Sequence, residues 1–428
     1  MSRDSILVWI LILLVGTSLF LSFNIWSQVP GKINDDTHIA EGKKVDLASV
    51  ANPGKLLVHL GGSICTVITP SSPLYESTLD FTKKTLASKW AEKKPEPTIH
   101  SQEYFIDKKG IEAFFSTPLP ANFIKRLLDI KPFDSTVLDG MMVKSYLIVE
   151  DQGVCVYLRD NNDKYFLISQ DSNQKELTLT LDKISNSNPI LFAELPSGNQ
   201  NLKIEKNIYV SLTPFEMSIY LCKDDEIVSD RIAAKFFPDF SITRKIEEKD
   251  EAVIYTDGQR GLRVYSDGAL EYSFPGVKEQ KKSTNFYDAL NTAVNFINAH
   301  GGWPRDGFLS SFEVVEYESG SYGYSFSFQM RIDGYPLVME KDYITITVEG
   351  TQVRNFYRKV PNIDRPKQHR QDQIISPIKA LDMAVLSQKI EKVDNIYQAY
   401  TVRDDLIIPV WIIESSNKKV FIQAYMEW

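Results

Sequence analysis

The hydrophobic pattern of the chain has two parts: an unbroken apolar run near the start and a long remainder of alternating and helical spacing. No charged side chain occurs from Ser5 to Gly31, and Ile6–Trp26 reads ILVWILILLVGTSLFLSFNIW. A helix needs about 20 apolar residues to cross a hydrocarbon core of ~30 Å. The run therefore predicts a single transmembrane helix over residues 6–26, with Trp9 and Trp26 near the two headgroup levels.

A cleaved signal peptide is the alternative, with Gly16–Thr17–Ser18 as a plausible cleavage site. The apolar run continues past that site to Ile25, beyond the ~7–15 residues usual for a signal sequence. We therefore expect an uncleaved anchor. Arg3 precedes the span and no positive excess follows it, so we expect a cytoplasmic N-terminus and an extracellular body.

Small polar residues mark one face of the predicted span. Leu11, Val15, Ser18 and Ser22 share this face, and the two serines have the spacing at which transmembrane backbones approach closely. These four residues are the predicted contact with a membrane partner. The alternative is that serine and threonine hydroxyls in the span bond back to their own helix.

The first part of the body mixes strand and helix patterns. Lys55–Ile68 predicts a buried strand with a glycine break, and Tyr75–Trp90 has helical spacing that ends before Pro95 and Pro97. A short helix is predicted at Pro120–Ile130. The stretch Val137–Leu181 is interpreted mostly as alternating strands.

The second part is more regular. Gly261–Pro275 predicts a hairpin around Asp267–Gly268, and a helix with apolar positions from Phe286 to Ile297 follows. Strands are predicted next, at Tyr322–Ile332, Tyr343–Val348 and Gln352–Arg358. Ser376 is a good N-cap for a second helix, with Pro377 at its first position and Ile378, Leu381 and Val385 as its apolar face. Three more strands are predicted at Ile396–Val402, Leu406–Ile413 and Lys419–Tyr425.

These patterns predict an α+β protein, with one N-terminal transmembrane helix before a multi-domain extracytoplasmic body. A helix on an antiparallel meander is expected twice within residues 283–428. The predicted parts are a cytoplasmic tail (1–5), the transmembrane helix (6–26), a stem (27–54), an N-terminal α+β domain (55–195), a middle domain with a helix on an antiparallel sheet (196–365) and a C-terminal helix-plus-meander domain (366–428).

Composition narrows the function. The full chain has 43% hydrophobic and 24% charged residues, which is typical of a folded globular protein. Its net charge of −8 argues against nucleic acid as a partner. Cys65, Cys155 and Cys222 lie in apolar, strand-like contexts, so we expect buried thiols without disulfides. No CxxC pair is present, and no cofactor or metal is predicted.

The search for catalytic motifs favours a non-enzymatic protein. Ser376–Lys379 forms an SxxK, but the SxN at Ser197–Asn199 precedes it and no KTG follows. His300–Trp303 resembles an esterase oxyanion loop without a GxSxG, and the five histidines lack metal-ligand spacing. A glycosidase pair of carboxylates facing a cleft stays open at this point.

An aromatic stripe over Tyr322–Phe328 leaves a second functional class open. If exposed, the stripe would form a binding surface for a ligand or peptide, such as a cell-wall component. If buried, it belongs to the core, since aromatic residues favour strands.

Four stretches carry a family resemblance: LSFNIWSQVP, YTDGQRGLRVYSDGALEYSFP, SPIKALDMAVL and IPVWIIES. With the order of features, they resemble the YycH family of envelope-side accessory proteins in Gram-positive bacteria. The resemblance implies three soluble domains, the C-terminal ones similar to YycI and to PepSY-type folds. It also implies a regulator of the essential sensor histidine kinase YycG (WalK), acting with a YycI-like membrane protein through the Leu11–Trp26 part of the span. No catalytic residue is implied.

Overall fold

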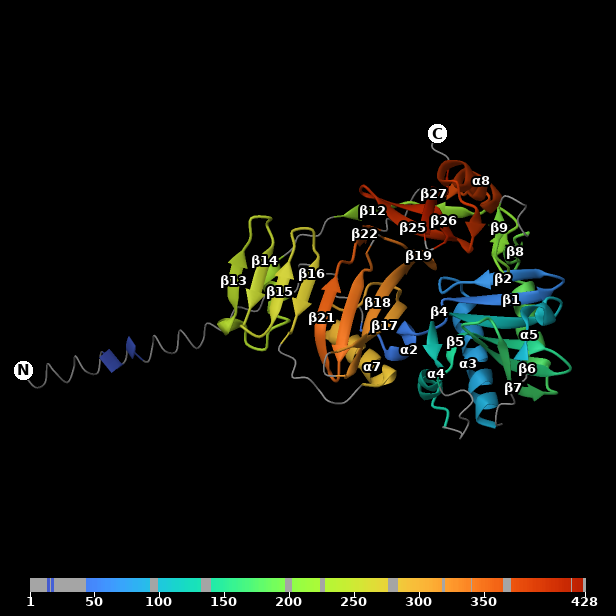
Figure 1. The fold of residues 1–428 in the computed structure, drawn as a ribbon, viewed down its shortest axis with the longest axis horizontal. Helices are drawn as coiled ribbons and strands as arrows, with labels where there is room; N and C mark the ends of the chain where they lie inside the picture. The colour runs from blue at the N-terminus through green and yellow to red at the C-terminus, as the bar shows by residue number, and fades with distance from the viewer. Residues whose placement is uncertain are drawn as a thin grey trace, which may run out of the picture. The chain divides into compact units, whose positions relative to one another are not determined.

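The computed structural model describes residues 14–15, 17–18, 44–92, 99–131, 140–196, 202–223, 228–275, 284–317, 320–339, 341–364, 371–416 and 418–425. The chain divides into two units, residues 1–41 and residues 42–428. The second unit is the body, and it is strand-rich with helices packed on its sheets (Figure 1). The expected mixture of helices and strands is therefore confirmed.

Residues 44–54, part of the predicted stem, belong to the same compact unit as the body. Helix α2 (Leu47–Val50) is capped by Asp46 and buries Leu47 and Val50. Val45 exchanges two backbone hydrogen bonds with the Asn298 side chain, at 3.0 and 2.9 Å. This distant partner explains why the local sequence did not indicate the contact.

The first sheet is formed by the earlier half of the body and is antiparallel throughout. Within the described residues it has nine strands in the order β10-β8-β2-β1-β4-β5-β6-β7-β3. Their bounds are β1 Lys55–Gly61, β2 Ile64–Ile68, β3 Ile99–His100, β4 Gly110–Pro120, β5 Met142–Glu150, β6 Val154–Asp160, β7 Tyr165–Asp171, β8 Leu191–Glu194 and β10 Tyr209–Ser211.

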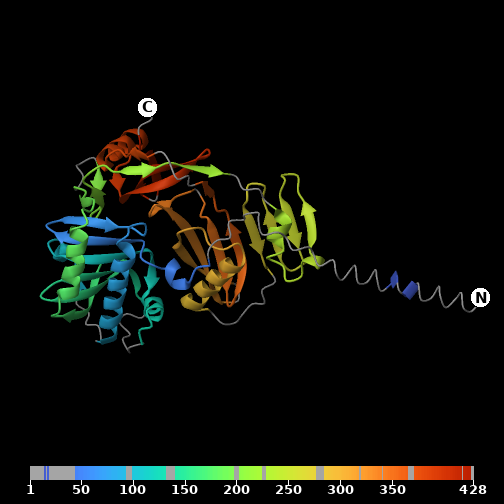
Figure 2. The same cartoon turned by 180° about the vertical axis from the view of Figure 1, so that it is seen from behind.

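Helix α3 (Tyr75–Glu92) covers one face of the first sheet (Figure 2). Its predicted apolar positions are buried, among them Leu79, Leu86 and Trp90. The Thr82 and Tyr146 hydroxyls, 3.0 Å apart, tie the helix to β5. Because side chains alternate along a strand, Tyr146 faces α3 and its neighbour Ser145 points to the other face of the sheet.

The interpretation of Val137–Leu181 as strands was correct for β5 to β7 and wrong at its end. Residues Lys175–Ser185 form helix α5, with Leu177, Leu181 and Ile184 buried. These three residues are spaced i, i+4 and i+7, which is helical spacing, and the strand interpretation stopped before the last of them. The shorter predicted helix is α4 (Ala121–Leu127).

The second sheet is formed by the later half of the body. Fourteen described strands belong to it, mainly in the order β13-β14-β15-β16-β21-β20-β18-β19-β25-β26-β12-β22, with β17 on β18 and β27 on β26. Their bounds are β12 Tyr220–Lys223, β13 Arg244–Glu247, β14 Val253–Thr256, β15 Gly261–Val264, β16 Leu270–Ser273, β17 Gly307–Glu316, β18 Tyr322–Ile332, β19 Tyr335–Leu337, β20 Ile344–Glu349, β21 Gln352–Arg358, β22 Asn362–Asp364, β25 Asn395–Arg403, β26 Leu406–Ser415 and β27 Lys418–Gln423.

Helix α7 (Phe286–Ala299) packs across β18, β20 and β21 (Figure 1). Asn285 caps its start, and Gly301, with a φ of 111°, follows the C-cap residue His300 at its end. The aromatic stripe of β18 packs beneath it: Phe326 and Phe328 are fully buried, and the Phe286 and Phe326 rings lie 5.6 Å apart. The core interpretation of the stripe is confirmed for these two residues, whereas Tyr322 is 44% exposed.

Helix α8 (Pro377–Gln388) packs on β26 and β27 of the C-terminal meander. The predicted apolar face of this helix was partly wrong, because Ile378 is 58% exposed. Ala380 and Ala384 are buried beside Leu381 instead, and their small side chains let the helix approach the sheet closely. The predicted doubling of the helix-on-meander unit, like the domain boundaries, stays a prediction.

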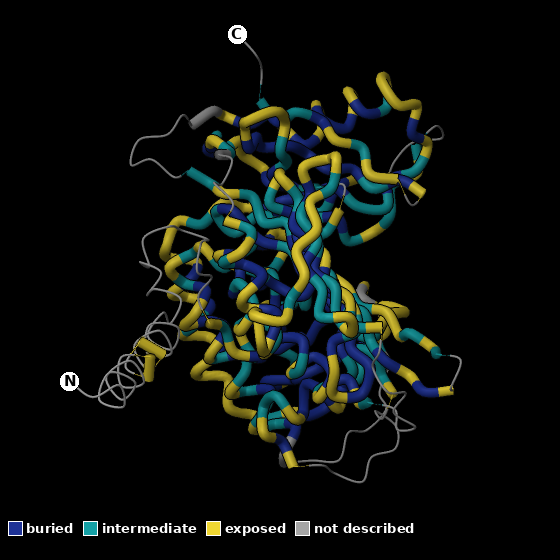
Figure 3. Tube along the Cα trace, turned by 90° about the vertical axis from the view of Figure 1, so that its left-hand side faces the viewer, coloured by how far each residue is buried: buried dark blue, intermediate teal, exposed yellow. Residues whose placement is uncertain are grey.

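Short pairings join distant segments of the body. Strand β9 (Lys203–Ile204) runs parallel to β24 (Lys392–Val393), and β11 (Glu216–Ser218) pairs with β23 (Gln371–Gln373). Strand β19 meets β25 through one parallel pair, Leu337 and Tyr400. Buried and exposed segments alternate through the unit, with exposed ones at many of the turns (Figure 3).

Candidate functional site

The predicted membrane contact falls mostly outside the described residues. Leu11 and Ser22 lie outside them, whereas Val15 and Ser18 belong to short helical stretches. The Val15 side chain is 51% exposed. The Thr17 hydroxyl donates to the Leu14 carbonyl at 3.0 Å, as expected for a threonine that bonds back to its own helix. No helix in the described part of the chain is both long and apolar enough to cross a membrane.

The serine of the SxxK motif has a structural role. Ser376 Oγ accepts the backbone N–H of Lys379 at 3.3 Å and caps α8, which confirms the capping interpretation. Ser197–Asn199 lies outside the described residues. Among the described residues, no group of three His, Cys, Asp or Glu side chains is arranged to hold a metal ion.

The described histidines are held by local contacts. The His300 ring stacks on Phe296 at 3.9 Å, and its Nδ1 lies 2.7 Å from the Phe296 carbonyl oxygen. Burial lowers the pKa of His300. His100 stacks on Tyr104 at 4.1 Å, and His59 belongs to the network described next. His38 and His369 lie outside the described residues.

A buried ionic network is the main polar cluster of the first sheet; we call it the Glu112 network. Phe114, Ser145, Arg159 and Tyr165 are register partners across β4, β5, β6 and β7. Their side chains therefore share one face, and Glu112 lies on that face two residues before Phe114.

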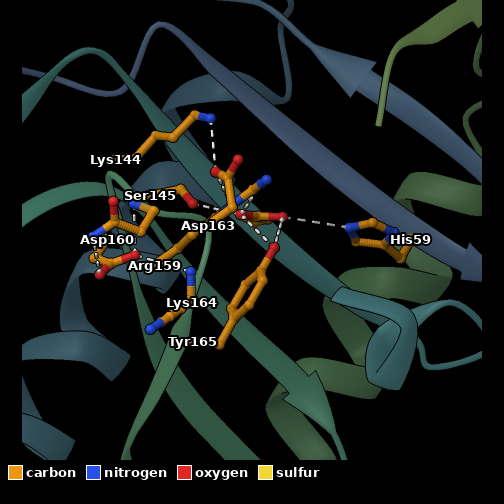
Figure 4. Close-up of polar contacts among 10 residues, drawn as sticks. His59, Lys144, Ser145, Arg159, Asp160, Asp163, Lys164 and Tyr165 are labelled. Atoms are coloured by element: carbon orange, nitrogen blue, oxygen red, sulfur yellow. Dashed lines mark hydrogen bonds and ion pairs between the residues drawn. The ribbon is translucent and has the colours of Figure 1, made fainter. Parts of the chain in front are cut away.

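Four side chains converge on the Glu112 carboxylate (Figure 4). Arg159 Nη1 lies 3.3 Å away, the Tyr165 hydroxyl 3.2 Å and His59 Nε2 3.8 Å, while the Ser145 hydroxyl donates a further hydrogen bond. Arg159 also donates to Asp163 at 3.0 Å. Glu112 is 1% exposed and Arg159 3%.

The network keeps Glu112 ionised. Burial acts to raise the pKa of Glu112, but the hydrogen bond from His59 and the positive charge of Arg159 outweigh it and hold the pKa well below its usual range. Burial and the same carboxylate raise the pKa of Tyr165. A carboxylate with its proton removed and its oxygens occupied is a poor general acid or nucleophile. The geometry therefore supports a structural role in holding β4 to β7 together.

Sequence reasoning missed this network. His59 was treated as a lone histidine, and no role was assigned to Glu112 or Arg159. The available signal was a charged residue inside an otherwise apolar strand, in GIEAFF and in VCVYLRD. Such residues are almost never fully buried unless they are paired.

The cysteine prediction holds where it concerns burial. Cys65 and Cys155 are buried without a disulfide, and burial raises the pKa of the two thiols to about 12 and about 11. Cys222 is partly exposed. The expected buried thiols are therefore confirmed at the first two positions.

Comparison with known proteins places the chain. Residues 205–427, more than half of it, match the family described as "YycH protein, C-terminal domain". The fold resembles a solved structure entitled "Crystal Structure of YycH from Bacillus subtilis", with a TM-score of 0.61 and 16% identity. That match covers 90% of this chain and 99% of the other. No curated protein sequence matches the chain.

Proposed function

Because the chain belongs to the YycH protein family, we propose that it is a membrane-anchored, non-enzymatic regulator of an essential sensor histidine kinase of the YycG (WalK) type. The family match is the single observation that carries this proposal. The apolar run Ile6–Trp26 supports the anchor. We place the N-terminus in the cytoplasm and the body outside, where a YycI-like membrane protein is the expected companion.

The proposed contact with the kinase is the face formed by Leu11, Val15, Ser18 and Ser22. A regulator must bind two states of its partner with different affinity. A coupling of about 1–3 kcal/mol changes a partner's equilibrium several-fold. A polar helix–helix contact in a membrane, worth about 1–2 kcal/mol, falls in that range. One helix can therefore supply the proposed effect.

The test is a co-purification from membranes with three forms of the full chain. One is native, one has residues 6–26 replaced by an unrelated apolar span, and one carries Ser18→Leu. Thr17→Val is the matched control, because the Thr17 hydroxyl bonds to its own helix at Leu14. We expect the kinase to co-purify with the native chain and with Thr17→Val, and to be lost from the other two.

The contrary result would be equal recovery of the kinase with the replaced span. In that case the contact lies in the body. Loss of the kinase from every form, including the native chain, would overturn the regulator proposal itself.

A further inference from the structure

A cavity of about 1170 Å³ lies within the body. One wall comes from β1, β2 and β4 of the first sheet, and the other from β17 to β19 with β25 and β26 of the second. Small-molecule sites have volumes of about 300–1000 Å³. The cavity is therefore large enough for a ligand of more than drug size, and nothing in the regulator proposal uses it.

Arg331 is the most unusual residue of the cavity lining. It lies on β18 and is only 8% exposed. Its Nη2 donates to the Ser116 hydroxyl at 2.7 Å, and its guanidinium carbon lies 3.5 Å from the centre of the Phe308 ring. Within the described residues, no carboxylate forms an ion pair with it. Burial lowers the pKa of Arg331 to about 10.

Lys55, at the start of β1, is a second cation of the lining, and the Glu112 carboxylate acts on its charge without forming an ion pair with it. Its residue is exposed, yet desolvation lowers the pKa of its amine. The residue lines the cavity, where its surface is accessible although protein atoms surround its amine. Its Nζ lies 5.2 Å from the centre of the Phe114 ring, and it forms no ion pair in the described part of the chain.

The other charged side chains of the cavity lining have ion-pair or hydrogen-bond partners, or lie opposite a residue of opposite charge in the sheet register. Lys144 pairs with Asp163 at 2.8 Å. Asp342 accepts from the Gln329 amide at 2.8 Å, and Glu414 accepts from the Tyr397 hydroxyl at 3.2 Å. Lys419 lies beside Glu414 in the β26–β27 register. The unmatched positive charge is therefore concentrated on Lys55 and Arg331.

A buried cation such as Arg331, with no ion pair in the described part of the chain, lowers the stability of the folded protein. One aromatic ring lies beside each cation, Phe114 at Lys55 and Phe308 at Arg331. Tyr209 and Tyr335 add further aromatic surface to the cavity lining. We propose that the cavity binds an organic anion: a carboxylate or phosphate group held by Arg331 and Lys55, on an apolar body packed against these rings.

Such a ligand would link the two sheets. Polar contacts already join the two walls beside the cavity: Arg331 reaches Ser116, and the Ser71 hydroxyl donates to the Asp333 carbonyl at 2.8 Å. An anion bound between Lys55 on one wall and Arg331 on the other adds a bridge across the same boundary. Binding therefore stabilises one arrangement of the two walls.

The test uses the full chain in lipid nanodiscs, with radiolabelled 4-phenylbutyrate as the probe in equilibrium dialysis and empty nanodiscs as the blank. Phenyl phosphate, 4-phenylbutanol and inorganic phosphate serve as competitors. Phenyl phosphate tests whether a phosphate can replace the carboxylate. The alcohol 4-phenylbutanol lacks the negative charge, and inorganic phosphate lacks the apolar body. Hydrogen exchange of β4 to β6 checks that each variant is folded.

We expect saturable binding that Arg331→Gln weakens by about tenfold or more, since a hydrogen bond to a charged group is lost. Lys55→Gln should weaken binding several-fold. Lys144→Gln is the matched control, a cation of the same lining that already has a partner, and should bind normally. Phenyl phosphate should compete, and the neutral alcohol should not.

A second readout locates the site. Acetylation of Lys55 by a neutral succinimidyl ester should slow several-fold when 4-phenylbutyrate is present, while acetylation of Lys84, an exposed lysine of α3 outside the cavity, should not change. Absence of saturable binding would overturn the proposal. So would equal competition by 4-phenylbutanol or by inorganic phosphate alone, or unchanged affinity in both Arg331→Gln and Lys55→Gln.

Discussion

The body contains two buried arginines, Arg159 and Arg331, whose charges have different neighbours. Arg159, on β6, is 3% exposed and lies between the carboxylates of Glu112 and Asp163. Arg331, on β18, is 8% exposed and has a hydroxyl and an aromatic ring as its neighbours. For both, burial acts to lower the pKa. The carboxylates of Glu112 and Asp163 outweigh burial at Arg159, whereas the influence of Tyr75 and Asp306 does not outweigh it at Arg331.

This difference separates a structural charge from one available to a ligand. The charge of Arg159 is satisfied inside the protein, so its removal should damage the fold. The charge of Arg331 is not satisfied there, so its removal should damage binding and leave the fold intact. The same substitution at both positions tests that distinction directly.

The largest expected effect is that of Arg159→Met. The substitution leaves the Glu112 carboxylate buried without its main positive partner, and breaking a buried pair in this way costs about 3–5 kcal/mol. We expect hydrogen exchange to show faster opening of β4, β5 and β6, whereas the strands around α7 keep their protection. Normal protection of β4 to β6 would mean that the Glu112 network contributes little to stability.

Acid should reduce the contribution of the Glu112 network to the free energy of unfolding. The pKa of Glu112 is lowered from 4.5 in the folded protein. Its stabilising contribution is therefore complete above the unfolded pKa and is lost as the pH falls through the folded pKa, by about 1.4 kcal/mol for each pKa unit. The stability difference between the native chain and Glu112→Gln should shrink as the pH falls from about 4.5 to about 2. A pH-independent difference would contradict the lowered pKa.

The sequence predicted those structural elements whose patterns lie within a short stretch of the chain, and it predicted less well the features that depend on tertiary contacts. Strands β18 and β21, the β15–β16 hairpin and the capped start of α8 were predicted because their patterns are complete within a few residues. The buried face of α8 was not, because its tertiary partners select Ala380 and Ala384 over Ile378. Family resemblance, and not periodicity, supplied the function.

Local sequence patterns do not predict the surroundings of either arginine, because the contacting residues are far away in the sequence. Arg159 and Glu112 are 47 residues apart, and Arg331 and Ser116 are 215 residues apart. A sequence shows that a strand carries a charged residue, but it does not show which distant strand supplies the partner. The cavity is formed by segments of the two sheets, so no single stretch of sequence indicates it.

Arg331→Met should change stability by less than about 1 kcal/mol. The hydrogen bond to Ser116 and the contact with Phe308 are lost, but so is the desolvation of an unpaired charge, and these contributions oppose one another. Thermal unfolding and hydrogen exchange should resemble those of the native chain, whereas 4-phenylbutyrate binding should weaken by about tenfold or more. A destabilisation as large as that of Arg159→Met would make Arg331 a structural residue.

The smallest change in stability, and the sharpest test of geometry, is Gly54→Ala. A Cβ at Gly54 would lie 2.7 Å from Arg331 Nη2 and 2.6 Å from Ser116 Oγ. Both atoms end flexible side chains, so the guanidinium can move away at a cost below about 1 kcal/mol. We expect 4-phenylbutyrate binding to weaken, although Arg331 keeps its positive charge, because the guanidinium has moved. Gly261→Ala is the matched control, since its Cβ would meet only Ser273 Oγ at 3.6 Å. Equal affinity in both alanine variants would show that the position of the guanidinium beside Ser116 does not matter for the anion.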